Sequence, residues 1–163
     1  MMLSTSFTIC ICFLVSLSAI FSSTRSWIVD SGAPRHICSN ANAFVSWKPL
    51  THATVTLPNH TPISVSLFGD VKLSPLLILK DVLHVPKFRF NLISVSALTV
   101  ASHLVVSFLH DSLIIQDLHN KTMIGRGNKV DDLYILDADS VTRSHGSCPV
   151  YPLISVNKVS AIV

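Results

Sequence analysis

The chain has 163 residues and a mass of 17.8 kDa, which is enough for one ordinary domain. Its content of 49% hydrophobic and 13% charged residues excludes general disorder. The twelve Lys and Arg residues give a formal net charge of +3, but they are scattered singly, so direct binding of nucleic acid is not expected. All nine acidic residues are Asp, which favours turns and strands over long exposed helices.

The cysteine pattern argues against a metal site. The four cysteines are Cys10, Cys12, Cys38 and Cys148, and they form neither a C-x-x-C pair nor a spacing with His that is typical of zinc ligands. We therefore expect no metal and no cofactor. Cys38 and Cys148, the two outside the apolar N-terminal stretch, are predicted to be free thiols.

An apolar stretch runs from Phe7 to Phe21. It is shorter than the roughly 20 residues that cross a bilayer, and its length suits the hydrophobic region of a secretory signal. However, no Lys or Arg precedes it, and Ser22-Ser23-Thr24 is a poor cleavage pattern. Two interpretations remain: a signal or anchor that leads to a membrane or the secretory pathway, or a chance apolar segment ahead of a cytoplasmic domain. The expected organisation is a leader over 1–25, a domain over 26–137 and an irregular tail over 138–163.

Beyond the leader, short apolar runs alternate with Pro, Asn, Asp, Gly and His about every ten residues, which is typical of an all-β barrel or sandwich. Hairpin tips are expected at 58–61, 110–112 and 119–121, and short helical turns at 40–44, capped by Ser39, and 94–101, capped by Ser94. The predicted strands are 27–29, 54–57, 63–67, 71–73, 76–79, 82–85, 104–109, 113–116, 123–124 and 133–136.

The sharpest local feature is the segment Trp27-Ile28-Val29-Asp30-Ser31-Gly32-Ala33, in which an apolar strand leads a carboxylate into a tight turn. Aspartic proteases need such an Asp, a following hydroxyl that ties the loop to its counterpart, and a Gly that lets backbone N–H groups approach the carboxylate. Two such loops must face each other so that one carboxylate keeps a proton while the other is ionised. On its own, Asp-Ser-Gly is more often an ordinary turn at the end of a strand.

The chain contains one such loop. Asp111-Ser112 and Asp139-Ser140 are not followed by Gly, so neither can serve as the second loop. A catalytic pair would require Asp30 from two copies of the chain related by a two-fold axis, which makes a homodimer a precondition of catalysis.

The sequence resembles the protease region of plant copia-type retrotransposon Pol polyproteins over about Ser26 to Asp137. The segments that carry this resemblance follow the family's order and spacing; they are 27–33, Arg35-His36-Ile37-Cys38, 55–59, 69–73, 77–86, 90–98, 115–117 and Ile124-Gly125-Arg126-Gly127. The resemblance implies a small retropepsin-like closed β-barrel with one or two short helices, which in an intact element cleaves the Gag-Pol polyprotein as a homodimer.

The resemblance also implies residue roles. Asp30 would be the catalytic carboxylate, Ser31 the hydroxyl that braces the dimer loops, and Gly32 and Ala33 the turn beneath the substrate. The hairpin around Pro58, Asn59 and His60 would form the flap over bound peptide. Leu92-Ile93-Ser94 would pack beneath the catalytic loop, with Ser94 where the broader retropepsin pattern has Gly.

Departures from the family keep a second function class open. The family's protease lies between a zinc-knuckle segment and an integrase, whereas here a hydrophobic leader and an unrelated tail flank the matching region. The alternative to an aspartic endopeptidase is therefore a non-catalytic β-barrel remnant with a structural or protein-binding role. His36, His60 and His84 lack an accompanying Ser or Cys nucleophile arrangement and are interpreted as surface or turn residues.

Overall fold

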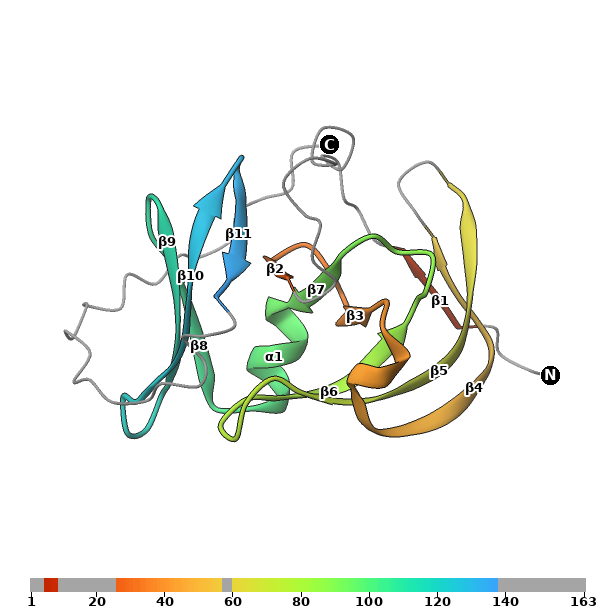
Figure 1. Cartoon of the computed structure of the whole chain (residues 1–163), viewed down its shortest axis with the longest axis horizontal. Coiled ribbons are helices and arrows are strands. Elements are labelled where there is room, and N and C mark those ends of the chain that lie inside the picture. The colour runs from red at the N-terminus through yellow and green to blue at the C-terminus, as the bar shows by residue number, and fades with distance from the viewer. Residues whose placement is uncertain (1–4, 9–25, 57–59, 138–163) are drawn as a thin grey trace.

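The computed structural model describes residues 5–8, 26–56 and 60–137, and strands dominate this part of the chain (Figure 1). A 3-10 helix spans Ala41–Ala43, and the α-helix α1 spans Val95–Ala101. The strands are β1 (Thr5–Thr8), β2 (Trp27–Asp30), β3 (Ile37–Cys38), β4 (Phe44–Thr56), β5 (Pro62–Lys72), β6 (Ile78–His84), β7 (Asn91–Ser94), β8 (Leu104–Phe108), β9 (Ser112–Asp117), β10 (Met123–Val130) and β11 (Leu133–Leu136).

The strands form one sheet in the order β1-β4-β5-β6-β3-β7-β2-β11-β10-β9-β8. The prediction of an all-β domain is confirmed, but the prediction of a closed barrel is wrong. In the described part of the chain, β1 and β8 are the two ends of the sheet and do not pair with each other. The sheet is strongly curved instead, so that β4, β5 and β6 lie to one side of α1 and β8 to β11 lie to the other (Figure 1).

The strand that leads to Asp30 lies in the middle of this sheet. β2 pairs in parallel with β7 and antiparallel with β11. Trp27, Ile28 and Val29 are all buried, although alternate residues of a strand point to opposite faces. A strand covered on both faces needs a continuous apolar run rather than an alternating one, which explains the sequence of β2.

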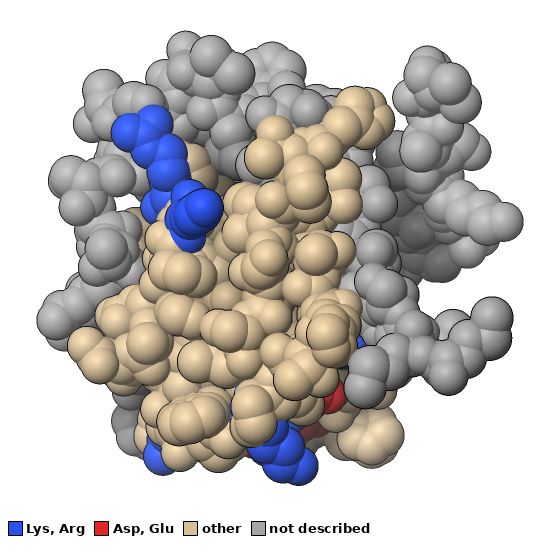
Figure 2. All heavy atoms as spheres, turned by 90° about the vertical axis from the view of Figure 1, so that its right-hand side faces the viewer, with Lys and Arg blue, Asp and Glu red and all other residues tan. Residues whose placement is uncertain are grey.

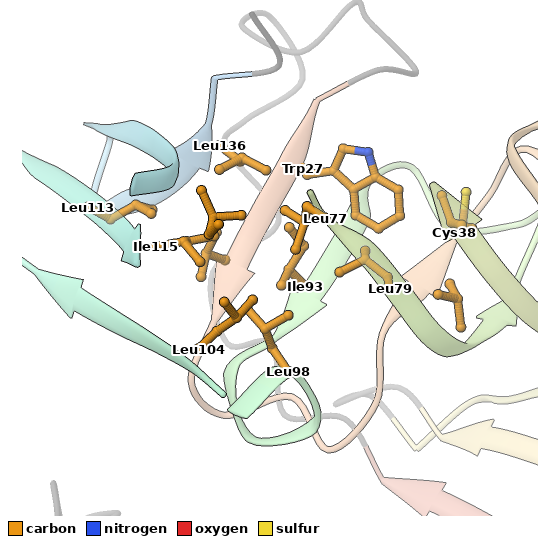
Figure 3. Packing of buried hydrophobic residues seen from close by; sticks show 14 residues of the cluster. Trp27, Cys38, Leu77, Leu79, Ile93, Leu98, Leu104, Leu113, Ile115 and Leu136 are labelled. Carbon is orange, nitrogen blue, oxygen red and sulfur yellow. The ribbon is translucent and has the colours of Figure 1, made fainter. Parts of the chain in front are cut away.

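Two apolar clusters cover the two faces of β2 and β7. Trp27, Val29 and Ile93 point into the larger cluster, in which Leu98 of α1 and Leu104 of β8 also lie (Figure 3). The smaller cluster takes the intervening side chains of the central strands and the inner side of the β4–β5 hairpin; its buried members are Ile28, Ile37, Ala53, Val55, Val65, Leu83, Val85, Phe88, Phe90 and Leu92. The turn after β2 is therefore anchored by packing on both sides.

The hairpin of β4 and β5 is longer than its sequence suggests. Strands were predicted at 54–57 and 63–67, whereas β4 begins at Phe44 and β5 continues to Lys72. The first part of β4 is exposed on both faces from Val45 to Pro49, so burial of an apolar face does not hold it in place. Backbone pairing with β5 maintains it, with register shifts at Phe44/Ser46 and Pro49/Ala53.

The remaining local predictions mostly agree with the structure. The predicted tips at 110–112 and 119–121 join β8 to β9 and β9 to β10. Ser94 caps α1 as predicted, since its side chain accepts the N–H of Ala97. The cap of the 3-10 helix is Asn40 rather than Ser39, because the Asn40 side chain accepts the N–H of Asn42.

The described residues include little of the predicted leader and none of the predicted tail. Thr5–Thr8, the part of the leader that is described, pairs in parallel with Ala53–Thr56 of β4. The rest of the leader and residues 138–163 lie outside the described residues. Within the described ranges, none of the helices is long and apolar enough to span a membrane.

Candidate active site around Asp30

Asp30 is the last residue of β2, and the chain turns away from the sheet immediately after it. The backbone N–H of Gly32 donates a hydrogen bond of 2.7 Å to Asp30 Oδ1. Asp30 is half-buried, Ser31 and Gly32 are exposed, and Ala33 is buried. The strand thus delivers a carboxylate to the surface of the domain in an orientation fixed by a backbone donor.

Within one protomer there is enough space for a side chain larger than Gly at position 32. A Cβ at this position would lie 3.4 Å from Asp30 Oδ1, which is ordinary van der Waals contact, and no other atom is close. The expected reason for Gly, close approach of the N–H to the carboxylate, does not by itself forbid a methyl group here. A need for Gly would come from a molecule outside the protomer.

The turn is tied to the start of α1 through Ser94. Asp30 and Ser94 are register partners in the parallel pair of β2 and β7. The fully buried Ser94 hydroxyl donates a hydrogen bond of 2.6 Å to the carbonyl oxygen of Ala33 and accepts the N–H of Ala97 at 3.1 Å. Ser96 adds a second, longer hydrogen bond to the Ala33 carbonyl at 3.4 Å. The expectation that 92–94 packs beneath this turn agrees with these contacts.

His36 supports Ser94 from the other side. The N–H of Ser94 donates to His36 Nδ1 at 3.0 Å, and the His36 side chain is buried. Burial, and to a lesser extent the positive charge of Arg35, lowers the pKa of His36 from 6.5 to about 4. The interpretation of His36 as a surface or turn residue is therefore wrong. His60 is exposed, and His84 is half-buried.

Asn91 fixes the other end of the β2–β7 pair. Its Oδ1 accepts the N–H and the hydroxyl of Ser39 at 3.1 and 3.3 Å, and its Nδ2 donates to the carbonyl oxygen of Ser26 at 3.3 Å. Asn91 is buried, so these hydrogen bonds satisfy a side chain that would otherwise be costly to desolvate. Asn91 was not predicted to have a role. The signal in the sequence was a polar amide between the apolar residues Phe90 and Leu92.

The predicted flap residues lie apart from this turn in the sequence and are only partly described. Pro58 and Asn59 lie outside the described residues. His60 is exposed at the end of the hairpin, with a φ of 61°. The hydrogen bonds and strand pairing given above bring Asp30, Ala33, His36 and Ser94 together, and they do not connect His60 to this group. The substrate-binding roles of Ala33, Pro58, Asn59 and His60 stay predictions.

Two features of the described ranges bear on the binding of metals and polyanions: the grouping of metal-ligating side chains and the charge on the hairpin side. No group of three or more His, Cys, Asp or Glu side chains there could hold a metal ion. On the side of the β4–β5 hairpin, uncharged residues cover most of the described surface in view, and the few Lys and Arg side chains lie near its margins (Figure 2).

Comparisons with known proteins find similarity over the part of the chain that contains these elements. Residues 27–103 match the family described as Pol polyprotein, beta-barrel domain. The chain is 34% identical over 116 residues to the retrovirus-related Pol polyprotein from transposon RE1 of Arabidopsis thaliana, a match that covers 69% of this chain. It is 32% identical over 114 residues, or 68% of this chain, to the corresponding polyprotein from transposon RE2 of the same plant.

The chain spans only 8% of the length of each of these two polyproteins. No solved structure matches it at a significant level. The matched range contains β2, the Asp30 turn and α1, which are the elements that form the candidate site. Taken together, the comparisons support a retrotransposon Pol region: residues 27–103 match the Pol polyprotein β-barrel domain, and about two thirds of the chain is similar to part of two retrovirus-related Pol polyproteins.

Proposed function

We propose that this domain is an aspartic endopeptidase of the copia-type retrotransposon kind, active only as a homodimer in which two Asp30 side chains meet. The observation that carries the proposal is the geometry of the turn. A carboxylate at the end of a strand buried on both faces accepts the Gly32 N–H at 2.7 Å, and a buried hydroxyl holds the same turn from below. The hydrogen bond from the Gly32 N–H alone would also suit an Asx turn, so the buried hydroxyl beneath the turn is what favours the proposal.

In the proposed dimer, one Asp30 carboxylate is protonated and its partner is ionised, because two like charges a few ångströms apart are costly. The ionised carboxylate takes a proton from a water molecule, whose oxygen attacks the peptide carbonyl carbon. The protonated carboxyl group donates its hydrogen to the carbonyl oxygen. The C–N bond then breaks as the leaving nitrogen receives the proton removed from water and one hydroxyl of the tetrahedral intermediate returns a proton to the other Asp30. The products are a carboxylic acid and an amine, and the starting pair of carboxyl groups is restored. Ser31 is proposed to brace the two turns across the two-fold axis.

The proposed substrate is a polypeptide of the element, the Gag-Pol polyprotein. An extended peptide would lie over the turn at Ala33 and beneath the hairpin tip at Pro58, Asn59 and His60. The long β4–β5 hairpin supports this proposal because it can carry a tip well away from the body of the domain. No direct contact with nucleic acid is part of the proposal, and any membrane contact would depend on the leader.

The first experiment compares cleavage of a fluorogenic peptide library by the full chain and by the Asp30→Asn variant at mildly acid pH, with and without pepstatin. Asp111→Asn is the matched control, since Asp111 also precedes a Ser in a turn but is exposed and lacks the following Gly. We expect cleavage by the wild type and by Asp111→Asn, and none by Asp30→Asn. Equal background in all three proteins would favour the non-catalytic remnant.

A second experiment tests the shared site. Increasing amounts of Asp30→Asn added to a fixed amount of wild type should lower the activity per wild-type chain, because mixed dimers contain one ionisable Asp30 rather than two. Asp111→Asn should not have this effect. Sedimentation that shows only monomers at tens of micromolar would rule out the shared site under those conditions.

A further inference from the structure

His36 occupies an unusual position for an ionisable side chain. Only 1% of its surface is exposed, and it lies directly before β3, with its carbonyl oxygen accepting the N–H of Leu83 at 3.0 Å. The hydrogen bond of its side chain goes to the Ser94 N–H and does not involve the Asp30 carboxylate. It is instead one step removed from the Asp30 turn, through Ser94.

The hydrogen bond between His36 and Ser94 fixes the protonation state of the imidazole. A backbone N–H can only donate, so Nδ1 of His36 must accept and must carry no hydrogen. The ring is therefore neutral, with its single hydrogen on Nε2. A proton added to Nδ1 would direct two N–H groups at each other across 3.0 Å.

Ser94 transmits this constraint to the turn. Its hydroxyl has three partners, the Ala33 carbonyl oxygen at 2.6 Å, the Ser96 hydroxyl at 3.0 Å and the Ala97 N–H at 3.1 Å. If its backbone N–H lost the His36 acceptor, the junction of β7 and α1 would have to move, and the hydroxyl would move with it. The path from His36 to the Asp30 turn thus consists of two buried hydrogen bonds.

The charged surroundings of His36 are few. Arg35 is the neighbouring cation on its own segment. The residues of β7 and α1, Asn91 to Ala101, include no ionisable side chain. β2 carries Asp30 opposite Ser94, and β6 carries the exposed Lys80 and Asp81 and the half-buried His84, which pairs with Cys38. In the described part of the chain, the hydrogen-bond partner of the His36 ring is the neutral N–H of Ser94.

We propose that His36 is a positioning residue for the Asp30 turn, which it holds through Ser94 only while Nδ1 is unprotonated, so that acid releases the turn. The predicted effect on peptide cleavage rests on the proposed function, whereas the predicted release of the turn in acid does not depend on it. Burial gives the direction of the pH effect, because it lowers the pKa of His36: the unfolded chain takes up the proton near pH 6.5, and the folded chain resists it until about pH 4. Stability therefore falls as the pH is lowered through this window.

The test uses two substitutions of His36 in the full chain. In His36→Asn, a side-chain oxygen can accept the Ser94 N–H near the position of Nδ1, and it does not titrate. In His36→Phe, the ring shape remains but the acceptor is lost. His110→Asn is the control, since His110 is an exposed His in the turn between β8 and β9.

The first measurement is independent of activity. The amide signals of Ala33 and Ser94 are followed by NMR as the pH is lowered. In the wild type and in the His110→Asn control, both signals should change together with a midpoint of about 4, the pKa of the buried His36. In His36→Asn the change that depends on His36 should be lost, whereas Asp30→Asn, which removes the nearby carboxylate, should keep it. Identical titration of these amides in the wild type and in His36→Asn would overturn the proposal.

The second measurement is the pH profile of cleavage. His36→Asn should keep activity at mildly acid pH within about threefold of wild type and extend it to lower pH, whereas His110→Asn should keep the wild-type profile. His36→Phe should lose at least tenfold in activity or fail to fold. A His36→Phe protein with wild-type activity and stability would overturn the positioning role. If no variant cleaves peptide, the proposed function fails, and the NMR titration alone decides this inference.

Discussion

Asp30 and Ser94 stand opposite each other across the parallel pair of β2 and β7, and the Ser94 hydroxyl reaches past this pairing to the Ala33 carbonyl oxygen at 2.6 Å. The Ser94 side chain thus both caps α1 and supports the turn.

Removal of this hydroxyl gives the first prediction. Ser94→Ala should lower the free energy of unfolding by about 1–2 kcal/mol, because it removes an N-cap and leaves the Ala33 carbonyl with only the longer bond from Ser96. Urea unfolding measures the change. Thr99→Ala is the control, since the exposed Thr99 hydroxyl donates within the same helix to Val95 O and should cost little. Equal losses in the two variants would contradict a special role for Ser94.

Gly32 and Gly69 should respond differently to Ala. A Cβ at Gly69 would collide with the carbonyl oxygen of Ser46 and lie 2.7 Å from Trp47 Cα, and both are backbone atoms that cannot swing away. Gly69→Ala should therefore cost about 3 kcal/mol, the upper end for overpacking. Gly32→Ala should change stability by less than about 0.5 kcal/mol, as ordinary surface substitutions do. Thermal or urea unfolding of the two variants measures the difference, and equal losses would contradict it.

The same Gly32→Ala variant also tests the dimer. If two turns meet face to face, the added methyl group lies where the partner and the substrate approach, so cleavage should fall while the stability of the chain is retained. Thermal unfolding and peptide cleavage are measured on the same preparation. Full activity in Gly32→Ala would contradict close approach of the partner at this position.

The ion pair between Lys80 and Asp70 gives a small, pH-dependent contribution. Lys80 Nζ lies 2.7 Å from Asp70 Oδ2, and this hydrogen bond, more than the other contacts, lowers the pKa of Asp70 from 3.8. A carboxyl group with a lowered pKa stabilises the fold above its unfolded value and loses this effect as the pH falls through its folded value. Lys80→Met should therefore cost at most about 1 kcal/mol at neutral pH, because the pair is partly exposed.

Urea unfolding over a pH series measures this effect, with the exposed Lys72→Met on the adjacent strand as the control. The difference between Lys80→Met and wild type should shrink once acid protonates Asp70. A difference that stayed constant down to strong acid would have a cause other than the ion pair.

Cys38 should be protected from thiol reagents. It is a free, buried thiol, and burial raises its pKa above the ordinary value of 9.0, so little thiolate is present at neutral pH. A chain with Ser at positions 10, 12 and 148 should react with a disulfide reagent slowly when folded and rapidly in urea. Rapid labelling of the folded chain would show that Cys38 is accessible.

The sequence predicted the elements whose signals are local. The continuous apolar run of β2, the Asp-Ser-Gly turn and the Ser94 cap each depend on a few adjacent residues, and the structure has all three where they were expected. His36 was misinterpreted because its partner, the N–H of Ser94, lies 58 residues away. When a buried side chain is stabilised by a donor far away in the sequence, the adjacent residues give no signal of its burial.

The open sheet was missed for a related reason. Short strands at regular spacing fit a closed barrel and a curved open sheet equally well, and closure depends on which strands meet at the ends. The early part of β4 was also missed, because its apolar–polar alternation is confined to Val45-Ser46-Trp47-Lys48 and ends at Pro49. Pairing with β5, rather than its own side chains, makes that segment a strand.

The position of β2 between β7 and β11 has a consequence for biosynthesis. Residue 30 is synthesised before both partner strands, so β2 gains one neighbour only after residue 94 and the other only after residue 136 has been made. A nascent or truncated chain that ends at residue 103 would leave one side of β2 without its partner strand. The acidic turn is thus encoded near the beginning of the domain and completed at its end, so premature termination would yield a polypeptide that contains Asp30 but not the finished sheet around it.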